Sequence, residues 1–301
     1  MSVELSPQNQ LKLIVEKTTK FFREKGFESA RLDTELLLAA ALKWERMKIY
    51  LNYEYPLSEA ELNACRELVK RRATGEPVAY ILGKKDFYNH SFKVSPAVLI
   101  PRPETEQIVE ESLKWLHSCE TKHVVDFGTG SGCIGLSILA EEPEADLIAI
   151  DISLDAIDIA RANAEALGVS DRVHFFNCDV GRFQSESIRK LFSAGADVVL
   201  ANPPYIAVDD QNIEANVKRF EPSQALFSAD FGLSHIRSWA AKALEAVSEN
   251  GMVMFEIGFE QGRDAKEIFE TLAGFQEIRI EKDLSGHERF VRAFRSVPKS
   301  S

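Results

Sequence analysis

The feature that most constrains the fold of this chain is a run of β-forming residues that ends directly in a glycine-rich loop. The run reads VVDFGTGSG over residues 124–132, and the apolar pattern after it is typical of a helix. Glycine lets a backbone turn sharply and pass close beside a ligand. In an open α/β sheet, ligands bind where such loops leave the carboxyl ends of the strands. We therefore expect an α/β fold with a binding site at this loop.

From residue 121 onward, segments with strand character alternate with helical ones. The predicted strands are 123–127, 147–151, 173–177, 197–201, 251–257, 276–281 and 289–294, and the predicted helices are 132–140, 154–167, 188–192, 234–247 and 261–272. The first five strands lack strict alternation, which predicts burial on both faces of a parallel sheet covered by helices. The last two are joined by a loop too short for a helical crossover and are expected to be antiparallel neighbours.

The residues before this region indicate two further parts. Apolar residues recur at helical spacing toward the amino terminus, which predicts a small helical-bundle domain over residues 1–75. Residues 76–103 mix β-branched and aromatic residues with turn signals. Because Asn89-His90 divides two short strand-like runs there, we expect a β-hairpin linker. Residues 104–301 then form the α/β domain.

Charge is distributed unevenly along the 301 residues. The whole chain has 36 Lys and Arg against 47 Asp and Glu, a net charge of −11. Residues 1–90 carry 15 basic and 13 acidic residues (15 − 13 = +2), and residues 91–301 carry the other 21 and 34 (21 − 34 = −13). This balance argues against a protein that binds nucleic acid mainly through phosphates, since such proteins have a broad basic face. The run Lys70-Arg71-Arg72 is interpreted as a solvated helix end, with contact to an acidic partner or ribosomal RNA as the alternative.

Cysteine usage and the terminal residues bear on the compartment. The four cysteines are scattered, with no CxxC pair and no histidine at metal-ligand spacing, which is typical of reduced packing residues in a cytosolic protein. We expect no signal peptide, because a basic start followed by an apolar stretch is lacking. The longest apolar run, residues 36–42, is much shorter than a membrane span of about 20 residues. We expect a cytoplasmic protein without a metal.

Three acidic residues at strand ends indicate which ligand the loop holds. The glycines of residues 128–132 are spaced GxGxG, which differs from the GxGxxG of dinucleotide sites. Asp126 precedes the loop and can lie near an ammonium group, whereas Asp151 ends the next strand and can accept both ribose hydroxyls. Asp179 follows the third strand and can accept from an adenine amino group. Each acid alone could be a helix cap or a loop end, but together they favour S-adenosylmethionine.

The tetrapeptide Asn202-Pro203-Pro204-Tyr205 follows the fourth predicted strand. Proline fixes the backbone and has no N–H to donate. The Asn202 side-chain oxygen and the Pro203 carbonyl can therefore accept the two hydrogens of a planar NH₂ group, and Tyr205 can stack on the amide or base. Holding both hydrogens aims the nitrogen in one direction. We interpret the tetrapeptide as a site for an sp² amino group beside a methyl donor, where Asn202 positions and polarises the nitrogen and no strong base is needed.

These motifs resemble those of class I S-adenosylmethionine-dependent methyltransferases that act on amide or exocyclic amino nitrogens. The segments GEP at 75–77, YI at 80–81 and LIPRPETE at 99–106 narrow the resemblance. With them, nearly the whole chain resembles the protein-glutamine N5-methyltransferases (PrmC/HemK family) that modify peptide-chain release factors. The resemblance implies a Rossmann-like seven-stranded mixed sheet, a helical substrate-recognition domain at 1–75, and methyl transfer to the glutamine of the GGQ motif.

The resemblance and the motifs together assign the site residues. The predicted cofactor-binding residues are Asp126, Gly128, Thr129, Gly130, Ser131, Gly132, Asp151, Asp179, Val180 and Asn202. The predicted substrate-binding residues are Asn202, Pro203, Pro204 and Tyr205, and Asn202, Pro203 and Tyr205 are assigned to catalysis. Many relatives carry an aromatic residue at the position of Val180, so either Val180 or Phe183 is expected to cover the adenine. Arg102 and Glu104 either shape a lid or pair with each other.

Several other functions compete with this hypothesis. The same reaction on a ribosomal-protein glutamine is the nearest one, and N6-adenine methylation of nucleic acid is the second, although it would require base flipping and phosphate contacts. An NAD-dependent oxidoreductase is disfavoured by the glycine spacing, and a non-catalytic module on the translation machinery by the intact motifs. We expect release factors as the protein substrate, no direct DNA or membrane partner, and a monomer.

Overall fold

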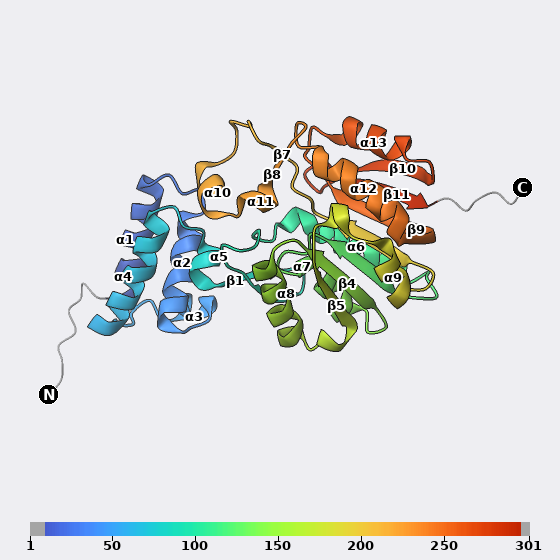
Figure 1. Cartoon of the computed structure of the whole chain (residues 1–301). Coiled ribbons are helices and arrows are strands. Elements are labelled where there is room, and N and C mark those ends of the chain that lie inside the picture. Colours follow the sequence, from blue (N-terminus) through green and yellow to red (C-terminus); the bar gives the residue numbers. More distant parts are fainter. Residues whose placement is uncertain (1–9, 296–301) are drawn as a thin grey trace, which may run out of the picture. The chain divides into compact units, whose positions relative to one another are not determined.

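The computed structural model describes residues 10–295, which divide into two compact units after Gly83 (Figure 1). This boundary lies inside the segment 76–103 that the sequence analysis treats as a linker, so the hairpin belongs to the second unit. Among the described residues, no helix combines the length and apolar character needed to cross a bilayer.

The first unit is helical, as predicted. Its helices are α1 (Leu11–Glu24), α2 (Ala30–Leu42), α3 (Arg46–Leu51), α4 (Glu59–Ala73) and α5 (Val78–Leu82). They pack around fully buried apolar side chains such as Leu11, Leu38 and Ile49. Helix α4 begins with a capping box, in which the Ser58 hydroxyl accepts from the Glu61 N–H and the Glu61 carboxylate accepts from the Ser58 N–H.

The basic run at residues 70–72 ends helix α4, and each of its side chains has an acidic partner within the first unit. Lys70 pairs with Glu67, Arg71 with Glu76, and Arg72 with the buried Asp33. The run therefore ends a helix, as interpreted, but only Lys70 and Arg71 are solvated, because the Arg72 side chain is 12% exposed. Arg72 also lies over the Phe27 ring, with its guanidinium carbon 3.8 Å from the ring centroid.

The second unit opens with a β-hairpin of β1 (Lys84–Phe87) and β2 (His90–Lys93), paired antiparallel. The turn consists of Tyr88 and Asn89, one residue earlier than predicted, because His90 already pairs with Phe87. The 3-10 helix η2 (Pro103–Thr105) and helix α6 (Glu106–Leu116) follow. Phe87 and Phe92 of the hairpin are buried in the same apolar cluster as Ile108 of α6.

A seven-stranded mixed sheet forms the centre of the second unit, with the order β10-β11-β9-β6-β3-β4-β5. The strands are β3 (His123–Phe127), β4 (Asp146–Asp151), β5 (Val173–Asn177), β6 (Ala196–Ala201), β9 (Val247–Glu256), β10 (Phe275–Lys282) and β11 (Glu288–Arg295). The first five are parallel neighbours, and β11 pairs antiparallel with both β10 and β9. Both the parallel and the antiparallel predictions are confirmed.

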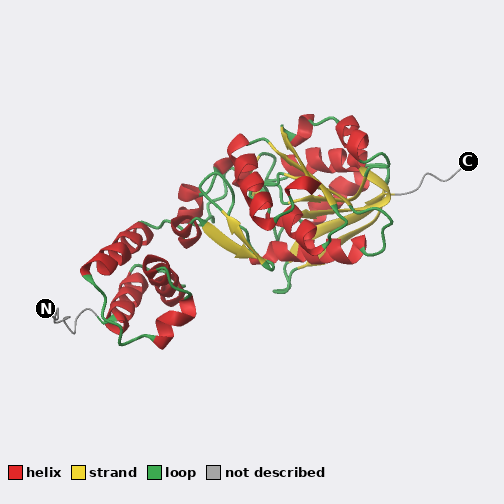
Figure 2. Ribbon diagram, turned by 90° about the horizontal axis from the view of Figure 1, so that it is seen from below, coloured by secondary structure: helices red, strands yellow, loops and turns green. Residues whose placement is uncertain are grey.

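Helices cover both faces of this sheet (Figure 2). These are α7 (Cys133–Glu141), α8 (Leu154–Leu167), α9 (Ser185–Leu191), α12 (Ser234–Ala246) and α13 (Gly262–Thr271), with short 3-10 turns η3 (Ser170–Arg172) and η4 (Val180–Arg182). Along β3, Val124 packs on the side of α6 and α7, whereas Val125 packs on the side of α12 and α13. Burial on both faces explains why the sequence of this strand does not alternate.

The segment between β6 and α12 carries structure that the sequence analysis did not predict. It contains β7 (Ile206–Ala207), α10 (Ala215–Phe220), α11 (Ser223–Leu226) and β8 (Phe227–Ser228), and β7 pairs parallel with β8. Each element is shorter than two helical turns or a typical strand, so none produces a readable periodicity.

Candidate active site

A cavity of about 400 Å³ lies at the carboxyl ends of β3, β4 and β6. This position is where an open α/β sheet binds its ligand, and the volume lies within the usual range for small-molecule sites. Its lining includes most of the sequence-predicted residues: Gly128, Thr129, Gly130, Ser131, Asp151, Asp179, Val180, Asn202 and Pro204. The predicted residues thus converge on one cavity from the ends of four strands, β3, β4, β5 and β6.

The glycine loop owes its shape to backbone conformations that other residues rarely adopt. Gly128 has a φ of +67°, and a Cβ added to it would lie 2.6 Å from the Trp239 ring. The backbone N–H groups of Gly128 and Thr129 donate to the Ile150 carbonyl at 2.8 and 3.0 Å, which ties the loop to β4. Gly132 caps α7 behind the lining, and its N–H donates to the Thr129 carbonyl at 2.8 Å.

Asp151 ends β4 and faces the cavity. The residue is buried, with 9% of its surface exposed. One oxygen accepts from the Gly130 N–H at 2.9 Å, and the other accepts from the Ser153 N–H at 2.9 Å. Burial raises the pKa of this carboxyl, while the backbone donors oppose that effect. Each carboxylate oxygen has capacity for a further donor, so the pair suits a ligand with two adjacent hydroxyls.

Asp126 lies beneath the loop rather than in the cavity lining, and its Oδ2 accepts from the Thr129 hydroxyl at 2.7 Å and the Gly135 N–H at 3.3 Å. Its Oδ1 has no hydrogen-bond partner among the described residues. Complete burial raises the pKa of Asp126 to about 7. In this structure the carboxyl holds the loop against the start of α7, and its place near a ligand ammonium group stays a prediction.

Val180 rather than Phe183 is available at the cavity to cover an adenine ring. Val180 lines the cavity, whereas Phe183 packs against Phe176 with ring centroids 5.4 Å apart and lies outside the lining. Ile152, which is 53% exposed, also lines the cavity and was missed by sequence reasoning. The available signal was its position directly after Asp151. The neighbouring Asp179 accepts from the Gly181 N–H at 2.8 Å, as a cap of η4.

Two residues of α12 also line the cavity although the sequence analysis assigned them no ligand contact. Trp239 is buried while presenting part of its ring to the loop. His235 contacts the Ser228 hydroxyl through Nδ1 at 2.8 Å, and burial lowers the pKa of the imidazole. No sequence spacing predicts a ligand contact for either residue, because the packing of α12 against the sheet brings both to the cavity.

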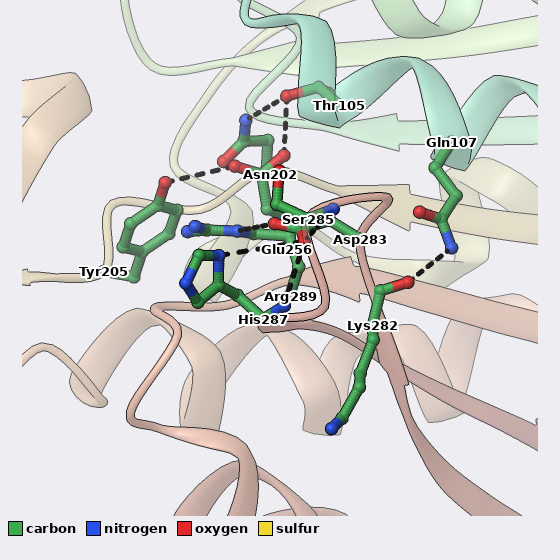
Figure 3. A network of polar contacts seen from close by, with 10 residues as sticks. All are labelled: Thr105, Gln107, Asn202, Tyr205, Glu256, Lys282, Asp283, Ser285, His287 and Arg289. Atoms are coloured by element: carbon green, nitrogen blue, oxygen red, sulfur yellow. Dashed lines mark hydrogen bonds and ion pairs between the residues drawn. The ribbon is translucent and has the colours of Figure 1, made fainter.

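The residues of the predicted substrate tetrapeptide lie between two cavities. Asn202 and Pro204 line the larger one, whereas Asn202, Pro203 and Tyr205 line a second cavity of about 110 Å³. The Asn202 Nδ2 donates to the Thr105 hydroxyl at 3.3 Å, and its Oδ1 accepts no hydrogen bond from the described residues (Figure 3). Asn202 therefore presents an acceptor at the wall that the two cavities share.

Arg102 lines both cavities, and its partner differs from the expected one. Its guanidinium pairs with Glu221 at 2.5 Å, whereas Glu104 is exposed on η2. Glu221 is buried and also accepts from the Ile100 N–H at 3.2 Å. The predicted alternative in which Arg102 pairs with Glu104 is therefore wrong. The ion pair ties the LIPRPETE segment to the residues before α11 and closes one wall of the site.

The donor and acceptor set fits S-adenosylmethionine. The Ser131 hydroxyl is buried in the lining without a partner among the described residues, so it remains available to a ligand. The lining also offers a carboxylate on β4 and apolar cover from Ile152 and Val180. No group of three or more His, Cys, Asp or Glu within residues 10–295 could hold a metal ion.

Together, the sheet order, the glycine loop and the cavity define a class I methyltransferase, the S-adenosylmethionine-dependent kind. Among solved structures, the hMettl16 catalytic domain in complex with the MAT2A 3'UTR hairpin 6 has a TM-score of 0.56. It is 15% identical and covers 78% of this chain and 84% of that one, which supports the fold alone.

Sequence comparisons narrow the class. The PrmC N-terminal domain matches residues 14–83, and the methyltransferase small domain matches residues 109–228. A release factor glutamine methyltransferase from Rhodopirellula baltica is 38% identical over 283 residues, covering 92% of this chain and 94% of that protein. Another from Nitratidesulfovibrio vulgaris is 37% identical over 272 residues and covers 90% of each chain. The chain belongs to the release factor glutamine methyltransferase family.

Proposed function

We propose that this protein transfers a methyl group from S-adenosylmethionine to the side-chain amide nitrogen of the glutamine in the GGQ motif of peptide-chain release factors. The observation that carries the proposal is the position of Asn202, which lines both the larger cavity at the glycine loop and the smaller one beside Pro203 and Tyr205. Methyl transfer needs the acceptor and the donor aligned and close together, and such alignment supplies much of the rate.

The larger cavity is proposed as the cofactor site. Residues 128–131 supply backbone and hydroxyl groups there, Asp151 accepts the ribose hydroxyls, and Val180 with Ile152 covers the adenine. Asp179 lies at the same end and is proposed to accept from the adenine amino group. When bound, S-adenosylmethionine supplies a methyl group on a positively charged sulfur.

The smaller cavity is proposed to receive the glutamine side chain. The Asn202 Oδ1 and the Pro203 carbonyl each accept one N–H of the substrate amide, which fixes the plane and direction of its nitrogen. Pro204 keeps the corner rigid, and Tyr205, a half-buried ring in the wall of this cavity, packs against the amide. The methylated amide loses one proton, and no strong base is needed because methyl transfer makes the N–H acidic.

The protein partner is proposed to contact both units. The helical first unit, which matches the PrmC N-terminal domain, is proposed to recognise the body of the release factor. The net charge of −13 over residues 91–301 disfavours a nucleic-acid substrate around the site. We propose a cytoplasmic enzyme that works as a monomer.

Methyl-labelled cofactor tests the proposal directly. The enzyme is incubated with purified release factor, with ribosomes and with DNA in separate reactions, and the labelled product is digested and analysed by mass spectrometry. We expect label on one release-factor peptide, at the glutamine of GGQ. Label confined to a ribosomal protein or to DNA would replace the proposed substrate by one of the alternatives.

A further inference from the structure

A buried carboxyl stands behind the Asn202 corner without a part in the chemistry described so far. Glu256 ends β9 and is 1% exposed. Its Oε2 accepts from the Thr105 hydroxyl at 2.6 Å, and its Oε1 accepts from the Tyr205 hydroxyl at 3.1 Å. Figure 3 shows how these side chains meet from three elements that are far apart in the sequence.

The hydrogen bonds in this group can run in one direction when Glu256 is ionised. The Nδ2 of Asn202 is purely a donor, so the Thr105 oxygen accepts from it at 3.3 Å. The Thr105 proton then goes to the Glu256 carboxylate, which is purely an acceptor in its ionised form. If the Asn202 amide were flipped, its oxygen would compete with Glu256 for that proton. The carboxylate therefore favours the orientation in which Asn202 Oδ1 is free.

The cost of burying Glu256 indicates that it is more than a packing residue. Among the described residues its hydrogen bonds come from two hydroxyls, and it forms no ion pair. The nearest cation in the network, Arg289, contacts Asp283 at 3.5 Å. Burial raises the pKa of Glu256, and the Arg289 charge opposes that effect. A buried carboxyl is expensive unless its interactions require it, and an apolar side chain would fill the same space.

We propose that Glu256 and Thr105 are positioning residues, which fix the Asn202 amide with its oxygen toward the substrate nitrogen. This inference rests on the proposed function. Positive charge develops on the substrate nitrogen during methyl transfer, and the nitrogen's hydrogen bond to Asn202 strengthens as it does. The relay from Asn202 through Thr105 to a carboxylate supports that change, because hydrogen bonds in a chain polarise one another.

Substitutions at Thr105 separate the hydroxyl from the volume of the side chain. Thr105→Val keeps the shape and removes the relay, whereas Thr105→Ser restores the hydroxyl. Ser112→Ala is the matched control, since it removes a buried hydroxyl of α6 that donates to the Ile108 carbonyl at 2.6 Å. Single-turnover and steady-state rates with release factor, the affinity for S-adenosylhomocysteine by calorimetry, and the melting temperature are measured for each variant.

We expect Thr105→Val to lower kcat about 10- to 100-fold. The KM for release factor should stay within about twofold, because the relay acts on the orientation of the Asn202 amide rather than on substrate binding. Thr105 also lines the larger cavity, so calorimetry shows whether weaker cofactor binding contributes to the lower rate. Thr105→Ser should return kcat to within about threefold of the wild type, and Ser112→Ala should leave it within about twofold. A Thr105→Val enzyme with nearly normal kcat, or a Thr105→Ser enzyme as slow as Thr105→Val, would overturn the inference.

The position of Glu256 in the relay is tested by combining substitutions. Glu256→Gln keeps an acceptor for Thr105 but removes the charge, so we expect a loss in kcat of about 3- to 10-fold. In the double variant with Thr105→Val, kcat should be no lower than in Thr105→Val alone. Losses that multiply would show that the two residues act independently. Wild-type enzyme that fails to label release factor would instead overturn the proposed function.

Discussion

The two walls of the site are built in different ways. The glycine loop at residues 128–132 comes from one short stretch of sequence, and its contacts to the rest of the site are mainly backbone groups. The Asn202 corner depends on side chains from η2, from the loop after β6 and from β9, which meet through hydroxyl and carboxyl contacts. The cofactor side is therefore encoded locally, and the substrate side by tertiary packing.

The largest expected effect is on the substrate side, at Asn202. Asn202→Ala should reduce kcat about 100- to 1000-fold, because it removes an acceptor aimed at the reacting nitrogen. The free energy of unfolding should change little, since the residue is only partly buried. Asn89→Ala, which removes an exposed asparagine of the hairpin, is the matched control. A normal kcat in Asn202→Ala would show that the substrate wall does not depend on this side chain, which contradicts the contrast drawn between the two walls.

On the cofactor side, the pH dependence of stability should report the buried Asp126. Its pKa is about 7 in the folded protein against an ordinary value of 3.8, so the folded state binds the proton more tightly. Stability from this group is complete below pH 4 and is lost as pH rises to 7, by about 4 kcal/mol. Asp126→Asn should remove that loss, as measured by urea unfolding from pH 4 to 8.

The exposed carboxyl of Asp158 on α8 provides the control for that measurement. Asp158→Asn removes one negative charge at an exposed position, so the pH profile of the wild type should stay in place if the burial of Asp126 determines it. If wild type and Asp126→Asn lose stability in parallel over this range, the burial of Asp126 does not determine the profile.

Two glycines with positive φ allow the cost of backbone strain to be measured separately from the cost of a steric clash. Gly128 and Gly168 have φ values of +67° and +70°, but an added Cβ meets Trp239 at Gly128 and open space at Gly168. Gly168→Ala should cost about 1 kcal/mol of stability. Gly128→Ala should cost about 2 kcal/mol more and weaken cofactor binding at least about 10-fold. Equal losses in both variants would mean that the loop tolerates the ring contact.

The smallest effect is expected at the apolar end of the cofactor cavity. Ile152→Ala should weaken the affinity for S-adenosylhomocysteine about 3- to 10-fold, because it removes apolar area that covers the ligand. Leu154→Ala is a close control, since Leu154 is 59% exposed and lies outside the cavity lining. Calorimetry on the two variants should differ; matching affinities would show that Ile152 does not cover the ligand.

The same contrast explains what could be predicted from the sequence. The strands of the sheet can be predicted from apolar runs, and the loop at residues 128–132 from glycine spacing. The predicted strands 123–127 and 173–177 match β3 and β5 at both ends. Asp151 was found because it ends a strand, and Asn202 because it directly follows one. These are local signals, and a parallel sheet brings such positions to one edge.

The parts that were not predicted depend on contacts between distant residues. Thr105 and Glu256 are 151 residues apart, and no periodicity or motif links them. Arg102 has a neighbouring acid at Glu104 in the sequence, yet folding pairs it with Glu221. The place of Asp126 beneath the loop was also decided by packing, because the Thr129 hydroxyl and the Gly135 N–H draw its carboxylate inward.

A wall that belongs to two cavities has a thermodynamic consequence. Asn202 and Arg102 line both, so a ligand that shifts either side chain in one cavity alters the fit of a ligand in the other. Such cooperativity is reciprocal: the factor by which bound cofactor changes the affinity for the acceptor glutamine equals the factor by which the glutamine changes the affinity for the cofactor. Release of the two products is then linked in the same way.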